Sequence, residues 1–292
     1  MVRSQANRAT FVASVLAFLK RFDLDGLDID WEFPAFSGVG SGNRSPGRKE
    51  DKADFGTLLK ELHTAFKTEG YILSTAVAAG KYHIDLAYDI PALNKYLDFV
   101  NVMVYDYHGL WDGVTGHNAP LYYAVNSTGA SRELTGQFTV EYFIEKGLSS
   151  KKLVFGVPLY GSVFKLANAT QNGLGAKIIG AGQEGGAYEH YCKLLKEPGW
   201  QLHWDSVAQV PYAVHGDNWL SYENLQSLAI KLNYIVSKHL GGSMVWAVDG
   251  DDVLNACGDG KFAMMKEQMK ILNKVNVVDT NIPIPSAHKN GH

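Results

Sequence analysis

Four carboxylates are concentrated in the run from Asp25 to Glu32, and three of them recur at every second position. Side chains alternate between faces along an extended strand, so Asp28, Asp30 and Glu32 point in one direction. Like charges held this close raise the proton affinity of one member, which can then donate a proton near neutral pH. The run is therefore a candidate for acid catalysis.

Two other interpretations of the run remain open. Three oxygen ligands could hold a hard metal cation, and a charged strand could be purely structural. The opposite face carries Leu27, Ile29 and Trp31, and Phe33-Pro34 follows the run as if at the carboxyl end of a strand. We favour acid catalysis, because perturbed carboxylates in such a position are typical of functional sites.

Strand and helix patterns alternate around this run. Strands are expected at about residues 23–32, 72–79, 98–106, 152–160 and 242–249. Helices are expected at about residues 51–68, 93–97, 139–147, 221–239 and 260–275. Repeated strand–helix units predict parallel strands, and chemical groups at several strand ends predict a (β/α) barrel. We count five strands where such a barrel has eight, so we expect an incomplete barrel.

The N-terminal segment is similar to a secretory leader, because Arg3 and Arg8 precede an apolar stretch. Its apolar residues recur at helical spacing, however, and Lys20-Arg21 leads into the acidic run without a small-residue cleavage site. We therefore expect an amphipathic helix and no leader in this chain. Residues 277–292 are expected to form a tail or linker.

Composition argues against several classes of function. The 292 residues are 46% apolar and 20% charged, as in a globular protein with a large core. A net charge of −3 predicts no surface for nucleic acid or anionic membrane, and no segment reaches membrane-spanning length. Two cysteines are too few for a structural zinc site, and we expect neither metal nor cofactor. The 12% of aromatic residues either fill the core or line a cleft that stacks sugar rings.

Four segments together resemble the family 18 glycoside hydrolases, the chitinases and their lectin-like relatives. The first is Asp25-Gly-Leu-Asp-Ile-Asp-Trp-Glu32. The others follow in family order: Met103-Val-Tyr-Asp-Tyr-His-Gly, Gly156-Val-Pro-Leu-Tyr-Gly and Met244-Val-Trp-Ala-Val-Asp. The resemblance spans nearly the whole chain and implies an α/β fold, a (β/α)8 TIM barrel with a small α+β insertion after the seventh strand. The Gly- and Trp-rich interval at 161–220, too long for a plain connection, matches that insertion.

By this resemblance the protein is a chitinase that cleaves β-1,4-linked N-acetylglucosamine with retained configuration, the substrate's own 2-acetamido oxygen acting as nucleophile. Glu32 would be the general acid, and later the base for water. Asp30 would orient the acetamido nitrogen and stabilise its positive charge, while Asp28 holds Asp30. Tyr105 would donate to the acetamido oxygen, with Asp106 hydrogen-bonding nearby.

The resemblance also implies the residues that bind sugar. Tyr160 would close the acetamido pocket, and Trp246 would stack under the sugar at the cleavage site. Trp111 would be a platform on the leaving-group side, and Met103 and Asp25 complete the expected set.

Some of these assignments have simpler alternatives. Tyr105, Tyr160 and Trp246 could instead be core residues. His108 and Asp249 are weaker candidates, and either could be structural. The family often carries Arg where Ser162 stands, so a sugar-binding cation is missing here.

The resemblance further divides the chain into a partial barrel at 1–160, the insertion at 161–220 and the C-terminal part of the barrel at 221–276. It implies a disulfide between Cys192 and Cys257, whereas composition alone leaves two free buried thiols as an alternative. It implies a secreted monomer that binds chitin or chitooligosaccharides. The glycosylation sequons at Asn43, Asn126 and Asn168 favour secretion.

The acidic run corresponds to the family's fourth strand, although it starts near residue 23 here. We therefore expect a fragment of a longer barrel, with little activity on its own. Two alternative functions remain. One is a lectin-like protein that binds chitin without cleaving it, which the presence of Glu32 disfavours. The other is an inactive fragment.

Overall fold

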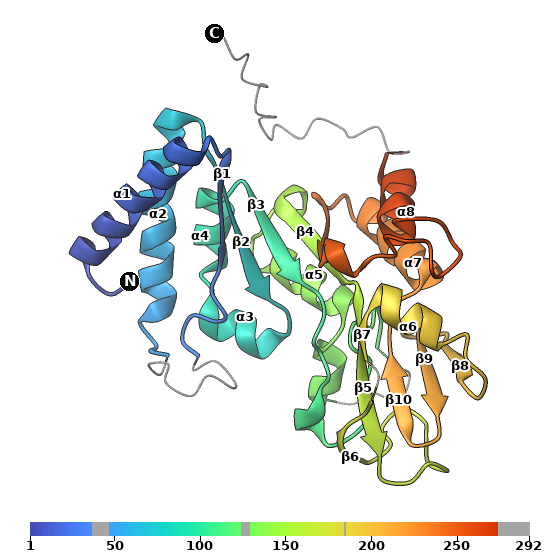
Figure 1. Cartoon of the computed structure of the whole chain (residues 1–292). Coiled ribbons are helices and arrows are strands. Elements are labelled where there is room, and N and C mark those ends of the chain that lie inside the picture. Colours follow the sequence, from blue (N-terminus) through green and yellow to red (C-terminus); the bar gives the residue numbers. More distant parts are fainter. Residues whose placement is uncertain (37–46, 124–128, 184, 274–292) are drawn as a thin grey trace.

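Five parallel strands form the main sheet of the protein, a computed structural model that describes residues 1–36, 47–123, 129–183 and 185–273. They lie in the order β1 (Gly26–Asp30), β2 (Ile72–Ala78), β3 (Phe99–Met103), β4 (Leu153–Pro158) and β11 (Gly242–Trp246). All four neighbouring pairs are parallel, so the carboxyl ends of the strands share one edge of the sheet (Figure 1). This edge is where a (β/α) barrel places its functional groups.

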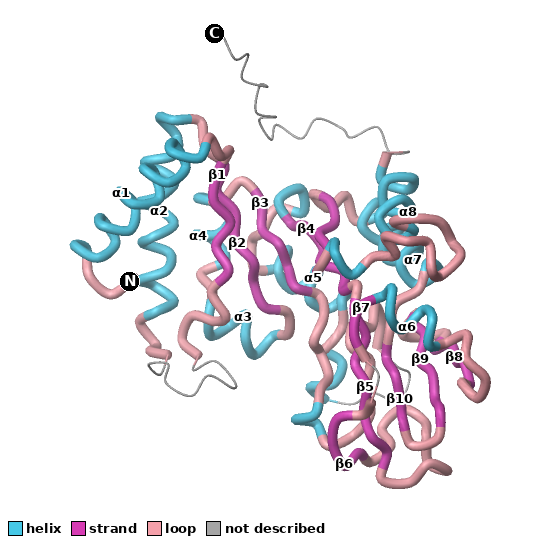
Figure 2. Tube along the Cα trace, viewed as in Figure 1, coloured by secondary structure: helices cyan, strands magenta, loops and turns pink. Residues whose placement is uncertain are grey.

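Helices lie between these strands along the chain (Figure 2). Apolar residues of the helices and strands share one buried core cluster. In α2, Phe55, Leu58, Leu59 and Leu62 recur at helical spacing and are almost fully buried. The predicted N-terminal amphipathic helix is present as α1, with Val15 buried. The helices are α1 (Gln5–Phe22), α2 (Asp51–Glu69), α3 (Lys81–Ala87), α4 (Ile90–Tyr96), α5 (Gly136–Glu145), α7 (Leu225–Ser237) and α8 (Ala263–Leu272).

A second, antiparallel sheet follows β4. Its strands lie in the order β6 (Ile178–Ala181), β5 (Tyr160–Leu166), β10 (Asn218–Ser221), β9 (Val210–His215) and β8 (Gln201–Asp205). The short strand β7 (Gly186–Ala187) pairs with β5 and leads into α6 (Tyr188–Leu194). Figure 1 places this sheet below β4 and away from α1 and α2. Its own small core contains Phe164, Leu166, Ile178, Val214 and Trp219. It is the α+β insertion expected from the sequence.

Most element boundaries differ from the sequence prediction by a few residues. The strands expected to end at residues 106, 160 and 249 end at Met103, Pro158 and Trp246. The strand of the acidic run ends at Asp30, so Glu32 lies two residues beyond it. The helix predicted from residue 221 begins at Leu225, because β10 extends to Ser221 and Asn224 caps the helix through the backbone N–H of Ser227. Helix α3 was not predicted, and it is only seven residues long.

Cys192 of α6 and Cys257, in the segment between β11 and α8, form a disulfide with a Cα–Cα distance of 5.6 Å. The bond spans 65 residues of sequence and links the insertion to the C-terminal part of the chain. Closing so long a loop restricts the unfolded chain and thereby stabilises the folded one.

A buried histidine ties the insertion to the loop that follows β3. The Nε2 atom of His117, which is 3% exposed, lies 3.1 Å from Oδ2 of Asp205 at the end of β8. The other carboxylate oxygen accepts the backbone N–H groups of Val207 and Ala208, each at 2.9 Å. The hydrogen bond from His117 is the main cause that lowers the pKa of Asp205 to about 2.

We expect Asp205→Asn to lower the thermal stability of the protein at neutral pH. A carboxyl with a lowered pKa stabilises the fold above its ordinary value of 3.8, and that contribution is lost as pH falls towards about 2. Melting curves of wild type and variant should therefore differ at pH 7 and converge near pH 2. The matched control is Asp217→Asn, which breaks an exposed pair between Asp217, in the turn from β9 to β10, and Lys165 of β5. It should change stability little. A constant difference between Asp205→Asn and wild type across this range would contradict the assignment.

Candidate active site

A cavity of about 280 Å³ lies at the carboxyl ends of the parallel strands. Groups from four of these strand ends meet there, although the strands are far apart in the sequence. The lining residues are Asp30, Glu32, Met103, Tyr105, Asp106, Tyr160 and Trp246. The structure therefore brings together seven of the residues singled out in the sequence.

Three carboxylates form a chain that leads into this cavity. Asp28 accepts hydrogen bonds from Ser74 Oγ at 2.6 Å and from Asn101 Nδ2 at 3.0 Å, which fix its orientation. Burial and then the charge of Asp28 raise the pKa of Asp30, while a hydrogen bond with Glu32 acts in the opposite direction. Asp30 is thus held between a fixed negative charge and the carboxyl group of Glu32.

Two tyrosines supply hydroxyl groups to the same cavity. Burial raises the pKa of both Tyr105 and Tyr160 well above the ordinary value, so both stay protonated and can donate hydrogen bonds. Tyr160 Oη donates to Asp106 Oδ1 at 2.6 Å. Burial raises the pKa of Asp106, and the bond from Tyr160 partly offsets this. The two tyrosine rings pack edge to face, with centroids 6.0 Å apart.

Trp246 closes the cavity from the end of β11. Its side chain is 56% exposed, an unusual state for a large aromatic ring, and it lines the same cavity as Asp30 and Glu32. The Trp246–Ala247 peptide bond is cis, and Trp246 O accepts the backbone N–H of Leu159 at 2.8 Å. An exposed indole beside hydrogen-bonding groups can stack on the apolar face of a sugar ring.

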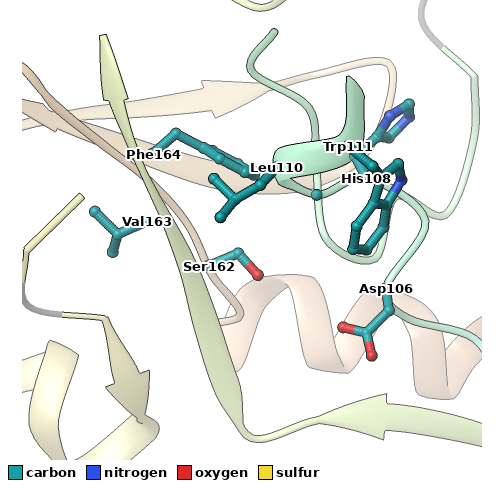
Figure 3. A pocket seen from close by; sticks show the side chains of 8 residues that line it. Asp106, His108, Leu110, Trp111, Ser162, Val163 and Phe164 are labelled. Carbon is teal, nitrogen blue, oxygen red and sulfur yellow. The ribbon is translucent and has the colours of Figure 1, made fainter. Parts of the chain in front are cut away.

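A second cavity, of about 340 Å³, adjoins the first and shares Asp106 with it. Figure 3 shows Leu110, Ser162 and Asp106 around this space, with the Trp111 ring on the side of Asp106. Trp111 is 69% exposed. The other lining residues are His108, Gly109, Val163 and Phe164.

His108 is held by a neighbour in its own loop. Its Nδ1 atom lies 3.1 Å from Asp112 Oδ2. Burial lowers the pKa of His108, although the charge and hydrogen bond of Asp112 oppose the shift. The groups that line this second cavity also include the Trp111 ring, the Ser162 hydroxyl and the Asp106 carboxylate.

Three expected site residues line neither cavity. Asp28 acts on the site through its charge on Asp30. Asp249 lies in the short 3₁₀ turn Val248–Gly250 after β11. Asp25 precedes β1, at the opposite end of the strand from Glu32, and its carbonyl accepts the backbone N–H of Ile72 at 2.9 Å. Packing explains the glycine that follows Asp25 in the motif. A Cβ atom on Gly26 would lie 2.1 Å from the carbonyl oxygen of Ile72, so a larger residue would not fit there.

Three supporting residues were missed in the sequence. Ser74 and Asn101 hold Asp28, and Met244 Sδ lies 3.9 Å from Tyr105 Oη. Asn101 had a signal that could have found it, because it is a lone amide within the apolar strand Phe99–Met103. Met244 also had one, because it opens the fourth motif segment. Ser74 had none, since nothing in its type or spacing sets it apart within its strand.

Other classes of site receive no support from the described residues. Within them, no group of three or more His, Cys, Asp or Glu side chains is arranged to hold a metal ion. None of the helices found there combines the length and the apolar character needed to cross a membrane.

The chain is similar to known chitinases over most of its length. Probable chitinase 10 of Drosophila melanogaster is 38% identical over 93% of this chain, and Chitotriosidase-1 of Mus musculus is 35% identical over 94%. The match spans only 12% of the fly protein and 60% of the mouse protein.

Solved structures agree with this similarity. The Group IV chitinase of Ostrinia furnacalis in complex with allosamidin superposes with a TM-score of 0.87, at 35% identity, over 94% of this chain and 75% of that one. Human YKL-39, described as a pseudo-chitinase with retained chitooligosaccharide binding, superposes with a TM-score of 0.85 at 32% identity, over 94% and 76% of the two chains.

These similarities confirm the fold class expected from the sequence, a (β/α)8 barrel type with an α+β insertion. Residues 1–251 also match the family described as "Glycosyl hydrolases family 18". Because that match covers most of the chain, the protein belongs to family 18 of the glycosyl hydrolases.

Proposed function

We propose that this protein hydrolyses the β-1,4 linkages between N-acetylglucosamine units of chitin and chitooligosaccharides. The observation that carries the proposal is the cavity in which Asp30 and Glu32 face two protonated tyrosines and an exposed tryptophan. Acid, hydrogen-bond donors and stacking surface are the groups that cleavage of an acetamido sugar needs. The similarity to chitinases supports the same substrate class.

The reaction is a substrate-assisted hydrolysis that retains configuration. Glu32 donates its proton to the glycosidic oxygen while the acetamido oxygen of the same sugar attacks the anomeric carbon, and the C–O bond to the leaving sugar breaks. The resulting oxazolinium carries positive charge near its nitrogen, which the Asp30 carboxylate stabilises. Glu32 then takes a proton from water, which attacks the anomeric carbon and reopens the ring.

The remaining site residues bind and orient the sugar. Tyr105 donates a hydrogen bond to the acetamido oxygen, and Tyr160 with Asp106 closes the pocket around the acetamido group. Trp246 stacks under the sugar whose linkage is cut, with Met103 beside it. The second cavity takes the leaving-group side of the chain, where Trp111 is the platform.

A chitin-binding protein without activity is the second candidate, because Human YKL-39 is similar to this chain. The presence of Glu32 in the cavity, next to Asp30, favours the enzyme. Both candidates predict sugar binding, and only the enzyme predicts product.

We also propose that the protein acts outside the cell. The disulfide between Cys192 and Cys257 supports this, since disulfides persist in oxidising compartments. The sequon at Asn168 is exposed in the turn after β5, whereas Asn43 and Asn126 lie outside the described residues. The proposed organisation is a barrel part at 1–160 and 221–276 and an insertion at 161–220, supported by the separate antiparallel sheet.

The substrate class can be tested with two pentasaccharides of the same linkage. We expect chitopentaose to be cleaved and cellopentaose, which has hydroxyl groups in place of the acetamido groups, to be left intact. Liquid chromatography of the products at high enzyme concentration distinguishes these outcomes. Cleavage of both sugars at similar rates would contradict the acetamido-assisted reaction, and binding of chitopentaose without product would favour the second candidate.

A further inference from the structure

We propose that Asn118 is a positioning residue that holds Asp106 in the backbone conformation required at the boundary of the two cavities. The inference rests on the proposed function for its effect on turnover, and on geometry alone for its effect on Asp106. Asn118 is not among the residues that line either cavity, and it belongs to none of the four motif segments.

Asp106 has a backbone conformation that must be enforced by its surroundings. Its φ angle is +56°, in the left-handed region that residues other than glycine rarely adopt. Such a conformation costs on the order of 1–3 kcal/mol and persists only where neighbouring contacts impose it. Because Asp106 lines both cavities and accepts the hydroxyl of Tyr160, this conformation sets where its carboxylate points.

Asn118 supplies the contacts that impose it. Its side-chain Oδ1 accepts the backbone N–H of Asp106 at 3.1 Å, and its main-chain oxygen accepts the N–H of Tyr107 at 3.1 Å. One residue therefore holds two consecutive N–H groups of the chain that leaves β3. Asn118 is only 2% exposed, so water competes little for these bonds.

Asn118 is in turn fixed from two directions. Its N–H donates to Ser221 Oγ at 2.8 Å, at the end of β10 in the insertion. The next carbonyl, of Ala119, accepts Lys231 Nζ of α7 at 2.6 Å. Lys231 is buried and also pairs with the buried carboxylate of Glu223. The insertion and α7 thus determine the position of Asn118.

The preceding residue strengthens this link, since His117 is bonded to Asp205 of β8. A rigid path of hydrogen bonds therefore runs from the antiparallel sheet through residues 117–119 to Asp106. Through it, the insertion positions a carboxylate of the site in addition to forming part of the second cavity. Misplacement of a catalytic group by about 1 Å can lower turnover by about 10²-fold.

Two substitutions separate this role from simple packing. Asn118→Leu keeps the size of the side chain and removes the acceptor, whereas Asn118→Asp keeps an oxygen at the same position. We expect hydrogen exchange at the Asp106 amide to become roughly tenfold faster in Asn118→Leu, the effect of losing one hydrogen bond, and to stay protected in Asn118→Asp. With chitopentaose we expect kcat to fall by about 10–100-fold in Asn118→Leu, with a smaller change in KM.

The matched control is Asn94→Leu. Asn94 Oδ1 also accepts a backbone N–H, that of Ser149 at 2.9 Å, but near the beginning of β4 and so at the opposite end of the sheet. We expect it to lower stability while leaving exchange at Asp106 and kcat unchanged. If Asn118→Leu does not fold, Asn118→Ala gives the same comparison.

A folded Asn118→Leu or Asn118→Ala protein whose Asp106 exchange stays within twofold of wild type would overturn the inference. So would an equal fall of kcat in Asn94→Leu. If wild type cleaves no chitopentaose, the proposed function fails, and the exchange rates of Asp106 still decide whether Asn118 holds it.

Discussion

Glu32→Gln should lower turnover of chitopentaose by at least about 10²–10⁴-fold, the usual contribution of general acid–base catalysis. Glutamine keeps the size and the hydrogen-bonding ability of the side chain, including its contact with Asp30, but has no acidic proton for the glycosidic oxygen. Binding of chitopentaose should survive, because Trp246 and Trp111 remain exposed for stacking. Calorimetry for affinity and chromatography for product separate the two effects.

Glu69→Gln is the control for this substitution, because Glu69 is an exposed residue at the end of α2. It should leave both affinity and turnover unchanged. If Glu32→Gln retains more than about one tenth of wild-type turnover, Glu32 is not the general acid.

Asp30→Asn should have the second-largest effect, a loss of about 10²–10³-fold in kcat, since it removes the negative charge that stabilises the acetamido nitrogen in the transition state. Its affinity for chitopentaose should change much less than its kcat. An equal loss in kcat/KM and in affinity would instead indicate that Asp30 acts only in binding.

The pH dependence of kcat/KM in Asp28→Asn is a second test of the role of the Asp30 carboxylate. Burial and the charge of Asp28 raise the pKa of Asp30, and the reaction needs Asp30 ionised, so activity is lost as pH falls through that raised pKa. Removing the charge of Asp28 removes one of these two causes. The acid limb of the kcat/KM profile should therefore move to lower pH in Asp28→Asn. An acid limb that stays at the same pH or moves to higher pH would contradict the effect of the Asp28 charge on the pKa of Asp30.

The sequence predicted the site correctly where reactive side chains fall within a regular strand or strand–helix pattern. Alternation placed Asp28 and Asp30 on one face of β1, and the strand–helix alternation predicted that the ends of β3, β4 and β11 would meet that of β1. Both follow from local rules, since side-chain alternation and parallel crossovers depend on short stretches of chain.

The role of a residue could not be predicted from the sequence where that role depends on contacts with residues far away along the chain. Asn118 lies in a loop, and its proposed role depends on its hydrogen bonds with Asp106 and Ser221, which are 12 and 103 residues away in the sequence. Asp25 showed the opposite error, since its place in an acidic motif suggested the site and the strand direction puts it at the other end of β1. The end of β1 at Asp30 was also missed, because Glu32 continues the alternating pattern beyond the paired residues.

The most direct test of the account is the configuration of the first product. Proton NMR of chitopentaose hydrolysis, recorded within minutes of mixing, distinguishes the anomers of the new reducing end before they interconvert. Attack by the acetamido oxygen followed by attack of water inverts the anomeric carbon twice, so we expect an initial excess of the β-anomer. An initial excess of the α-anomer would mean that water attacks directly, and would contradict the roles given to Glu32, Asp30 and Tyr105.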